Sequence, residues 1–254
     1  MSCNTIILVT GANRGIGKGL VTAYLAHSNI TVVATVRNLS SAEPLHSLLK
    51  ASGSRLIVIE AEFASMESIK RGIASLTSEH NIDSLDIVIA NAGIAAMSPK
   101  LLEAGYSEIQ PIIDVNAYGQ LELFKAVAPL LRNSKNNTKG KFVYISSAGG
   151  SLTTMNIIAP LSAYGASKAL GNFFFKWLSL EQQDIIVWSQ NPGMVATEMA
   201  KAAFEEVKLQ GLDLASMAIS VEQSCQAMLQ VISNATLESA HGKFLAHDGE
   251  ELPW

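Results

Sequence analysis

The chain has 254 residues, of which 48% are hydrophobic and 16% are charged, and its formal net charge is −4 at pH 7. This composition excludes a disordered chain, and without a lysine- and arginine-rich cluster it gives no footprint for nucleic acid or an anionic membrane surface. We therefore expect one folded domain, residues 1–254, whose partner is a small molecule.

Seven short apolar segments predict strands, at residues 5–9, 30–36, 55–59, 85–90, 141–145, 185–189 and 243–246. Longer segments with helical periodicity lie between them, including residues 17–27, 65–80, 107–131, 163–181 and 221–233. This alternation predicts an α/β fold: a Rossmann-type, doubly wound parallel sheet of about seven strands with helices on both faces. Such sheets bind ligands beyond the carboxyl ends of their strands, so we expect the site at that edge.

The first predicted strand runs directly into a glycine-rich turn, residues 10–17. Such a turn can hold a dinucleotide, because a pyrophosphate reaches backbone N–H groups only where no Cβ intervenes, and the positive end of the next helix attracts the anion. A turn that only tightens a strand-to-helix corner is the alternative interpretation. The residues expected to bind the cofactor here are Gly11, Asn13, Arg14, Gly15, Ile16 and Gly17.

The second predicted strand ends in Val36 and Arg37. An acidic side chain at this place would bind the ribose hydroxyls of NADH, whereas Arg37 and Arg14 offer planar guanidinium groups that suit a 2′-phosphate. The sequence therefore favours NADPH/NADP+ over NADH, with two solvated surface arginines as the alternative.

The cysteines and histidines give no sign of a metal site. Cys3 and Cys225 have no metal-ligand spacing, so we expect free thiols, and the five histidines are scattered along the chain. No apolar run approaches the roughly 20 residues that cross a bilayer, and residues 1–4 carry no basic segment ahead of a long apolar stretch. We expect no metal, no membrane partner and a cytoplasmic location.

Further motifs follow the predicted strands in chain order: Asn91-Ala92-Gly93, the pair Ser146-Ser147, Tyr164-x-x-x-Lys168 and Pro192-Gly193. Together with the glycine turn, they resemble the short-chain dehydrogenase/reductase family. Residues 31–38, 163–168 and 248–254 resemble, more narrowly, fungal ketoreductases related to norsolorinic acid ketoreductase. The resemblance implies a cofactor half, roughly residues 1–135, and a catalytic and substrate half, roughly residues 136–254.

The resemblance also implies further cofactor contacts. Glu62 and Phe63 stand where the family typically has an aspartate followed by a small apolar residue against the adenine, and the longer glutamate puts this contact in doubt. Thr197 matches a residue that touches the nicotinamide amide in relatives, with a helix N-cap as an equally physical interpretation. The other residues implied are Asn91, Ala92, Gly93, Tyr164, Lys168, Pro192, Gly193 and Val195.

Tyr164 and Lys168 stand one helical turn apart, so their side chains share a helix face. A free tyrosine ionises near pH 10, and a unit charge about 4 Å away is worth roughly 4 kcal/mol at an effective dielectric of about 20. We therefore expect Lys168 to lower the pKa of Tyr164, the proton donor to a ketone or aldehyde. A half-buried helix tyrosine beside a solvated lysine is the alternative.

The remaining catalytic residues are implied by the resemblance. Ser147 orients the carbonyl oxygen, with Ser146 as the fallback, and Asn116 holds a water that links Lys168 to solvent. Lys168 also holds the cofactor ribose. The alternatives are a serine pair that only caps the turn after its strand and an ordinary mid-helix asparagine.

Residues 95–97, 149–162 and 194–214 are expected to contact the substrate, and they carry few charges. Their large apolar residues favour a bulky, apolar or aromatic carbonyl compound: Met97, Leu152, Met155, Ile157, Ile158, Met199 and Phe204. We predict NADPH-dependent reduction of such a ketone or aldehyde to an alcohol. An NADP(H)-binding regulatory protein with little turnover, or an alcohol dehydrogenase working mainly in the oxidative direction, stays open. The resemblance allows a homodimer or homotetramer.

Overall fold

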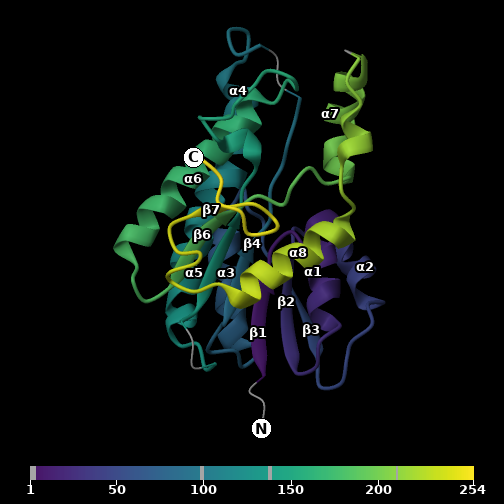
Figure 1. The fold of residues 1–254 in the computed structure, drawn as a ribbon. Helices are drawn as coiled ribbons and strands as arrows, with labels where there is room; N and C mark the ends of the chain where they lie inside the picture. The colour runs from purple at the N-terminus through teal and green to yellow at the C-terminus, as the bar shows by residue number, and fades with distance from the viewer. Residues whose placement is uncertain (1–3, 98–99, 137–138, 210) are drawn as a thin grey trace.

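The computed structural model describes residues 4–97, 100–136, 139–209 and 211–254. Its centre is one parallel sheet in the order β3-β2-β1-β4-β5-β6-β7 (Figure 1). The strands are β1 Thr5–Val9, β2 Ile30–Val36, β3 Arg55–Glu60, β4 Ile87–Ala90, β5 Lys141–Ile145, β6 Ile186–Gln190 and β7 Phe244–Leu245. The predicted Rossmann-type sheet is confirmed. Of the two cysteines, Cys225 is buried and free, whereas Cys3 lies outside the described residues.

Helices cover both faces of the sheet (Figure 1). Along β1, Ile7 and Val9 belong to the core on one face and Leu8 to the core on the other, as the two-residue period of a strand requires. Burial on both faces explains why the predicted strands are apolar almost throughout. One face packs on α1 Gly15–Leu25, α2 Glu43–His46 and α8 Val221–Asn234, and the other on α3 Met66–Ser78, α5 Gly119–Arg132 and α6 Ser162–Glu181.

The strand register brings the loops of the site to one edge. Val9 of β1 is level with Ala34 of β2 and Ile89 of β4, so β1 ends one residue before β4 and two residues before β2. The strand order reverses at β1, where β2 lies on one side and β4 on the other. Figure 1 shows α4 Tyr106–Ile113 and α7 Glu198–Leu209 beyond this carboxyl edge, where they flank the predicted site.

The helix predicted for residues 107–131 is divided into three parts. A π-helical segment, Asp114–Tyr118, separates α4 from α5. At Gly119 the backbone packs so closely that a Cβ would lie 2.5 Å from the carbonyl oxygen of Phe63. The prediction was wrong in treating this stretch as one regular helix, because a single wide turn leaves the apolar periodicity of the sequence intact. Helix α7 was also missed, since only Val207 in it is buried.

Candidate active site

The glycine turn forms a cradle that only glycine permits. Gly11 and Gly15 have positive φ angles of 63° and 55°. At Gly17 a Cβ would lie 2.2 Å from the carbonyl oxygen of Gly11. Arg14, the N-cap residue of α1, makes no side-chain capping bond, and the first turn of α1 contains no acidic residue. The turn therefore offers uncapped backbone N–H groups to an anion, which fits the diphosphate of a dinucleotide.

Thr10 ties this cradle to the loop after β4. Its Oγ1 accepts hydrogen bonds from the backbone N–H groups of Asn91 and Ala92, both at 2.9 Å. The Asn91 side chain returns a bond of 2.8 Å from Nδ2 to the Thr10 carbonyl. Thr10 is not among the residues predicted for the site, although its place between β1 and the first glycine is a signal that could have revealed it.

The loops after β2 and β3 bring together two residues that are predicted to contact the cofactor, Arg37 and Glu62. Arg37 Nε lies 3.7 Å from Glu62 Oε2, and the Arg37 side chain is 75% exposed. Phe63 is only 4% exposed and packs in the core, so its side chain is turned away from the site. Arg14 also has an acidic neighbour, because it contributes, after Lys201, to holding the pKa of Glu198 below its usual range.

Ser147, Tyr164 and Lys168 come together at the end of β5. The side chain of Ser147 lies close enough to the phenol of Tyr164 to lower its pKa by hydrogen bonding. The Lys168 amine lies 5.7 Å from the centroid of the Tyr164 ring and donates a hydrogen bond of 2.7 Å to the carbonyl of Ile145. Tyr164 is half-buried and Lys168 is 4% exposed, so Lys168 is the more enclosed of the two side chains.

The electrostatics of this group differ from the sequence-based expectation. Burial raises the pKa of Tyr164, while the hydrogen bond with Ser147 lowers it in part. Burial also lowers the pKa of Lys168 to about 7. The expected lowering of the phenol pKa by Lys168 is thus not found in this structure, because burial dominates the pKa of Tyr164 and Ser147 is the group that lowers it.

The two serines after β5 point to different partners. Ser146 is 1% exposed and its hydroxyl donates a hydrogen bond of 2.6 Å to Asn172 Oδ1. Ser147 instead lies beside the Tyr164 phenol, whose pKa it lowers, and its Oγ accepts a hydrogen bond from the Gly149 N–H at 3.1 Å. Consecutive extended residues place their side chains on opposite sides, so only the second serine faces the phenol.

Asn116 is fully buried in the π-helical segment. Its Nδ2 donates hydrogen bonds of 2.8 Å to the Ile94 carbonyl and 3.0 Å to Ser167 Oγ, and its Oδ1 accepts from the Ile94 N–H at 2.8 Å. Its own carbonyl accepts a hydrogen bond of 2.9 Å from Tyr144. Asn116 therefore joins the loop after β4 to α6 through protein contacts, rather than facing solvent.

The loop after β6 completes the edge of the site. The Pro192 carbonyl accepts a hydrogen bond of 2.6 Å from the Ser224 hydroxyl of α8, and Gly193 has a positive φ of 83°. Val195 is buried and pairs with Ile219. Thr197 Oγ1 accepts from the Ala200 N–H at 3.3 Å, which is the N-cap role left open by the sequence. A Cβ on Gly15 would approach the Thr197 side chain to 3.8 Å, so this loop faces the glycine turn.

Comparisons with known proteins agree with this arrangement. The family model for short chain dehydrogenases matches residues 5–208. The chain is 54% identical to short chain dehydrogenase gsfK of Penicillium aethiopicum over 98% of both proteins. It is 36% identical to norsolorinic acid ketoreductase nor1 of Dothistroma septosporum, covering 100% of this chain and 94% of that protein. The chain belongs to the short-chain dehydrogenase family.

Among solved structures, this short-chain dehydrogenase is similar to the NADPH-bound carbonyl reductase from chicken fatty liver, at 26% identity and a TM-score of 0.82 over 100% of both chains. It is 27% identical to the carbonyl reductase Sniffer of Drosophila melanogaster, with a TM-score of 0.83 over 99% of this chain and 100% of that one. The predicted family and its resemblance to norsolorinic acid ketoreductases are therefore confirmed, and an oxidoreductase of the carbonyl reductase type is supported.

Most of the apolar residues that are predicted to contact the substrate of this short-chain dehydrogenase have exposed side chains. Of the residues predicted to contact substrate, Phe204 is half-buried and residue 210 of the segment 194–214 lies outside the described residues. Thr153 ties the segment 149–162 to the carbonyl of Trp254 with hydrogen bonds of 3.1 Å and 2.6 Å. The exposed members are Met97, Leu152, Met155, Ile157, Ile158 and Met199.

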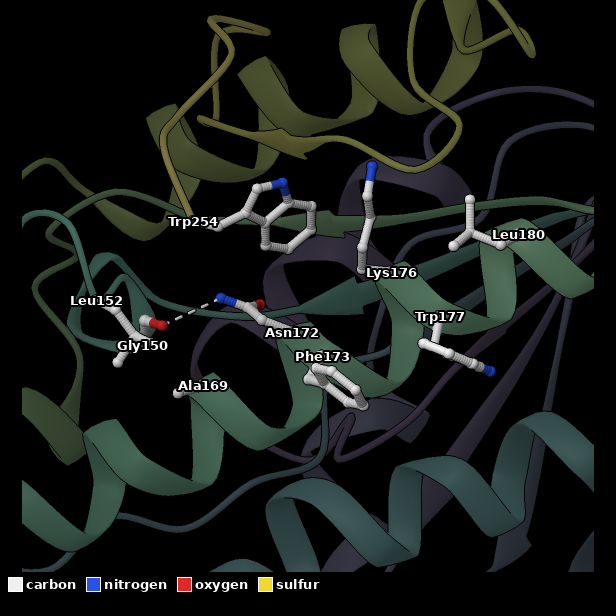
Figure 2. A pocket seen from close by; sticks show the side chains of 9 residues that line it. All are labelled: Gly150, Leu152, Ala169, Asn172, Phe173, Lys176, Trp177, Leu180 and Trp254. Carbon is white, nitrogen blue, oxygen red and sulfur yellow. Dashed lines mark hydrogen bonds between the residues drawn. The ribbon is translucent and has the colours of Figure 1, made fainter.

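A separate apolar cavity of about 270 Å³ lies beside the site, along α6 (Figure 2). Asn172 forms part of its wall and donates a hydrogen bond of 3.4 Å to the Gly150 carbonyl, the dashed line in Figure 2. Because Asn172 also accepts a hydrogen bond from Ser146, it connects this wall to the loop after β5.

Within residues 4–97, 100–136, 139–209 and 211–254, no group of three or more His, Cys, Asp or Glu side chains is placed to hold a metal ion. None of the helices in these ranges is long and apolar enough to span a membrane.

Proposed function

We propose that this protein is an NADPH-dependent carbonyl reductase that converts a bulky, apolar or aromatic ketone or aldehyde to an alcohol. The observation that carries the proposal is that Ser147 lies close enough to the phenol of the half-buried Tyr164 to lower its pKa by hydrogen bonding, with the Lys168 amine 5.7 Å from the centroid of that ring. The hydroxyl groups of Ser147 and Tyr164, with the buried Lys168 amine beside them, are suited to bind and protonate one oxygen atom.

In this proposal, bound NADPH supplies the hydride to the carbonyl carbon. Tyr164 donates its phenolic proton to the carbonyl oxygen, so the product is the neutral alcohol. Ser147 orients that oxygen beside the phenol and stabilises the phenolate left after proton transfer, as its lowering effect on the pKa of Tyr164 indicates. Lys168 holds the cofactor ribose and, when charged, adds to the stabilisation of the phenolate.

The glycine cradle and Arg37 are proposed to hold NADPH. The uncapped N-terminus of α1 provides N–H groups for the diphosphate, and the exposed Arg37 guanidinium provides donors for a 2′-phosphate. The NADPH-bound chicken carbonyl reductase supports this choice of coenzyme. The nearby Glu62 carboxylate works against it, since it competes for Arg37 and repels a phosphate.

The substrate class rests on the exposed apolar side chains and on the relatives. Leu152, Met155 and Ile158 expose apolar side chains in the segment 149–162, which is expected to contact the substrate. Two relatives are named norsolorinic acid ketoreductase, at 36% and 35% identity, which supports a polyketide-like aromatic ketone. The proposal also includes the division into halves 1–135 and 136–254, a cytoplasmic location, and a homodimer or homotetramer.

The proposal is tested by following coenzyme oxidation by the purified protein at matched NADPH and NADH concentrations. The substrates are aromatic diketones, quinones and polyketide-like ketones, with small sugars and organic acids as controls. We expect turnover with the aromatic ketones and NADPH. Tight NADPH binding without turnover of any ketone would favour the regulatory protein, and faster oxidation of the matching alcohols with NADP+ at neutral pH would favour the alcohol dehydrogenase.

A further inference from the structure

The surroundings of Lys168 contain little that stabilises a charge. Its side chain is 4% exposed, and within the described residues its amine donates one hydrogen bond, to Ile145. An ammonium group has three N–H donors, and a buried one normally needs several partners or an anion. Such desolvation favours the neutral amine, whereas the proposed role of Lys168 needs the ammonium form.

Tyr144 presents the face of its ring to this amine. The Lys168 Nζ lies 4.9 Å from the centroid of the Tyr144 ring, closer than to the Tyr164 ring at 5.7 Å. At this distance the negative face of the aromatic ring attracts a cation, and the attraction is largest where both groups are desolvated. Tyr144 is fully buried, so water does not screen this contact.

The position of the Tyr144 ring is determined from three sides. Phe175 stacks on it with a centroid distance of 4.6 Å and an interplanar angle of 27°. Gly171 of α6 makes room for it, because a Cβ there would lie 2.3 Å from the Tyr144 hydroxyl oxygen. That hydroxyl donates a hydrogen bond of 2.9 Å to the Asn116 carbonyl. Burial raises the pKa of Tyr144 well above its usual value, so the hydroxyl keeps its proton.

We propose that Tyr144 is a positioning residue for Lys168: the ring, anchored to Asn116 by its hydroxyl and packed on Phe175, favours the ammonium form of the amine. This inference rests on the proposed function, in which that charge stabilises the Tyr164 phenolate. The titratable groups that face the amine are Tyr144 from β5 and Tyr164 from α6 itself. In the π-helical segment, Asp114 is bonded to Gln110 at 2.6 Å and Tyr118 contacts Phe174, so these two groups are engaged elsewhere.

The test measures the ionisation of Lys168 directly, without turnover. Protein labelled with ¹³C-lysine is titrated by NMR, and the Lys168 signal is assigned from its loss in Lys168→Gln. We expect Tyr144→Leu, which removes the ring, to lower the pKa of Lys168 by about one unit. Tyr144→Phe, which keeps the ring and loses only the hydroxyl, should titrate within about 0.3 units of the unchanged protein. Equal values for Tyr144→Leu and the unchanged protein, or a higher value for Tyr144→Leu, would overturn the proposal.

Phe175→Leu is the control for packing. It removes the aromatic ring that stacks on Tyr144 and leaves the Tyr144 ring in contact with Lys168. We expect it to lower stability while the pKa of Lys168 stays in place; a shift as large as that of Tyr144→Leu would reassign the effect to core packing. The alkaline limb of the kcat profile for ketone reduction should move with the NMR value. A shifted Lys168 signal in a protein that reduces no ketone would support the role of Tyr144 and refute the proposed function.

Discussion

The Lys168 amine lies 5.7 Å from the centroid of the Tyr164 ring, while Ser147 lies close enough to the Tyr164 phenol to lower its pKa by hydrogen bonding. The two residues are one turn apart on α6 but occupy different environments. Tyr164 is half-buried and Lys168 is 4% exposed. Proton donation and charge stabilisation are thereby assigned to separate side chains, and each can be tested by its own substitution.

Tyr164→Phe removes the proposed proton and keeps the ring. We expect kcat for ketone reduction to fall by about 10²-fold or more, the usual size of a lost general acid, while the Kd for NADPH changes little. The measurements are steady-state kinetics and fluorescence titration with NADPH. A variant that retains substantial turnover would refute the role of Tyr164 as proton donor.

The serine pair predicts two different outcomes for the same chemical change. Ser147→Ala should lower kcat by about 10²-fold with little loss of stability, since the lost hydroxyl acts on the reacting oxygen. Ser146→Ala should instead lower the free energy of unfolding by about 1–3 kcal/mol, because Asn172 loses its buried partner. Urea unfolding and kinetics on both variants separate the two. The reverse pattern would make Ser146 the orienting residue.

Arg37→Ala should weaken NADPH binding about tenfold and leave NADH binding nearly unchanged, because only NADPH carries a 2′-phosphate. Glu62→Gln, which removes the carboxylate 3.7 Å from Arg37, is expected to tighten NADPH binding by roughly twofold to fivefold. Calorimetric titration with both coenzymes checks each variant. Equal losses for NADPH and NADH in Arg37→Ala would remove the argument for 2′-phosphate recognition.

Gly17→Ala adds a Cβ that would meet the Gly11 carbonyl oxygen at 2.2 Å. Because the obstacle is backbone, the cradle must open, and we expect NADPH binding to weaken by more than about tenfold together with a loss of stability. Gly105→Ala is the control, since its φ is −84° and its new Cβ would meet nothing closer than 3.5 Å. It should bind NADPH as the unchanged protein does; similar losses in both variants would argue against a cradle.

The depressed pKa of Lys168 predicts a pH dependence of stability. Its pKa is about 7 in the folded protein, against an ordinary value of 10.5 for a lysine. Between these values the unfolded chain binds the extra proton, so this group makes the folded state more stable as pH rises. The free energy of unfolding of the wild-type protein, relative to that of Lys168→Met, should therefore rise by at most about 1.4 kcal/mol per pH unit in this window. Urea unfolding of both proteins at pH 7.5 and 9 measures the difference. If the free energies of unfolding of the two proteins differ by the same amount at pH 7.5 and at pH 9, Lys168 remains charged in the folded protein.

Much of the fold could be predicted because its signals are local. The strand β2, Ile30–Val36, was predicted with the bounds that the structure has, since an apolar β-branched run between polar residues leaves little choice. The strand predicted at residues 185–189 is β6, Ile186–Gln190, in the structure; its last residue, Gln190, is polar and yet fully buried, with its Nε2 bonded to the Ala246 carbonyl. A residue that is buried through a distant partner leaves no periodicity to detect.

For the site as well, residues with a local sequence signal could be predicted, whereas contacts between distant segments could not. Gly11, Gly15 and Gly17 were predicted from their spacing after a strand, and the structure gives each a backbone reason. The pairing of Arg37 with Glu62 and the place of Tyr144 against Lys168 were not predicted, since each joins elements distant in the chain.

The sequence by itself determined the seven strands, the glycine cradle and the helical spacing that puts Tyr164 and Lys168 on one face, because these depend on neighbours within a few residues. Only the tertiary structure decided which serine meets the phenol, that Asn116 lies in a π-helical segment, and how far burial lowers the pKa of Lys168. Hydrogen-bond partners and desolvation depend on what other segments place around a group, and that is known only once the chain has folded.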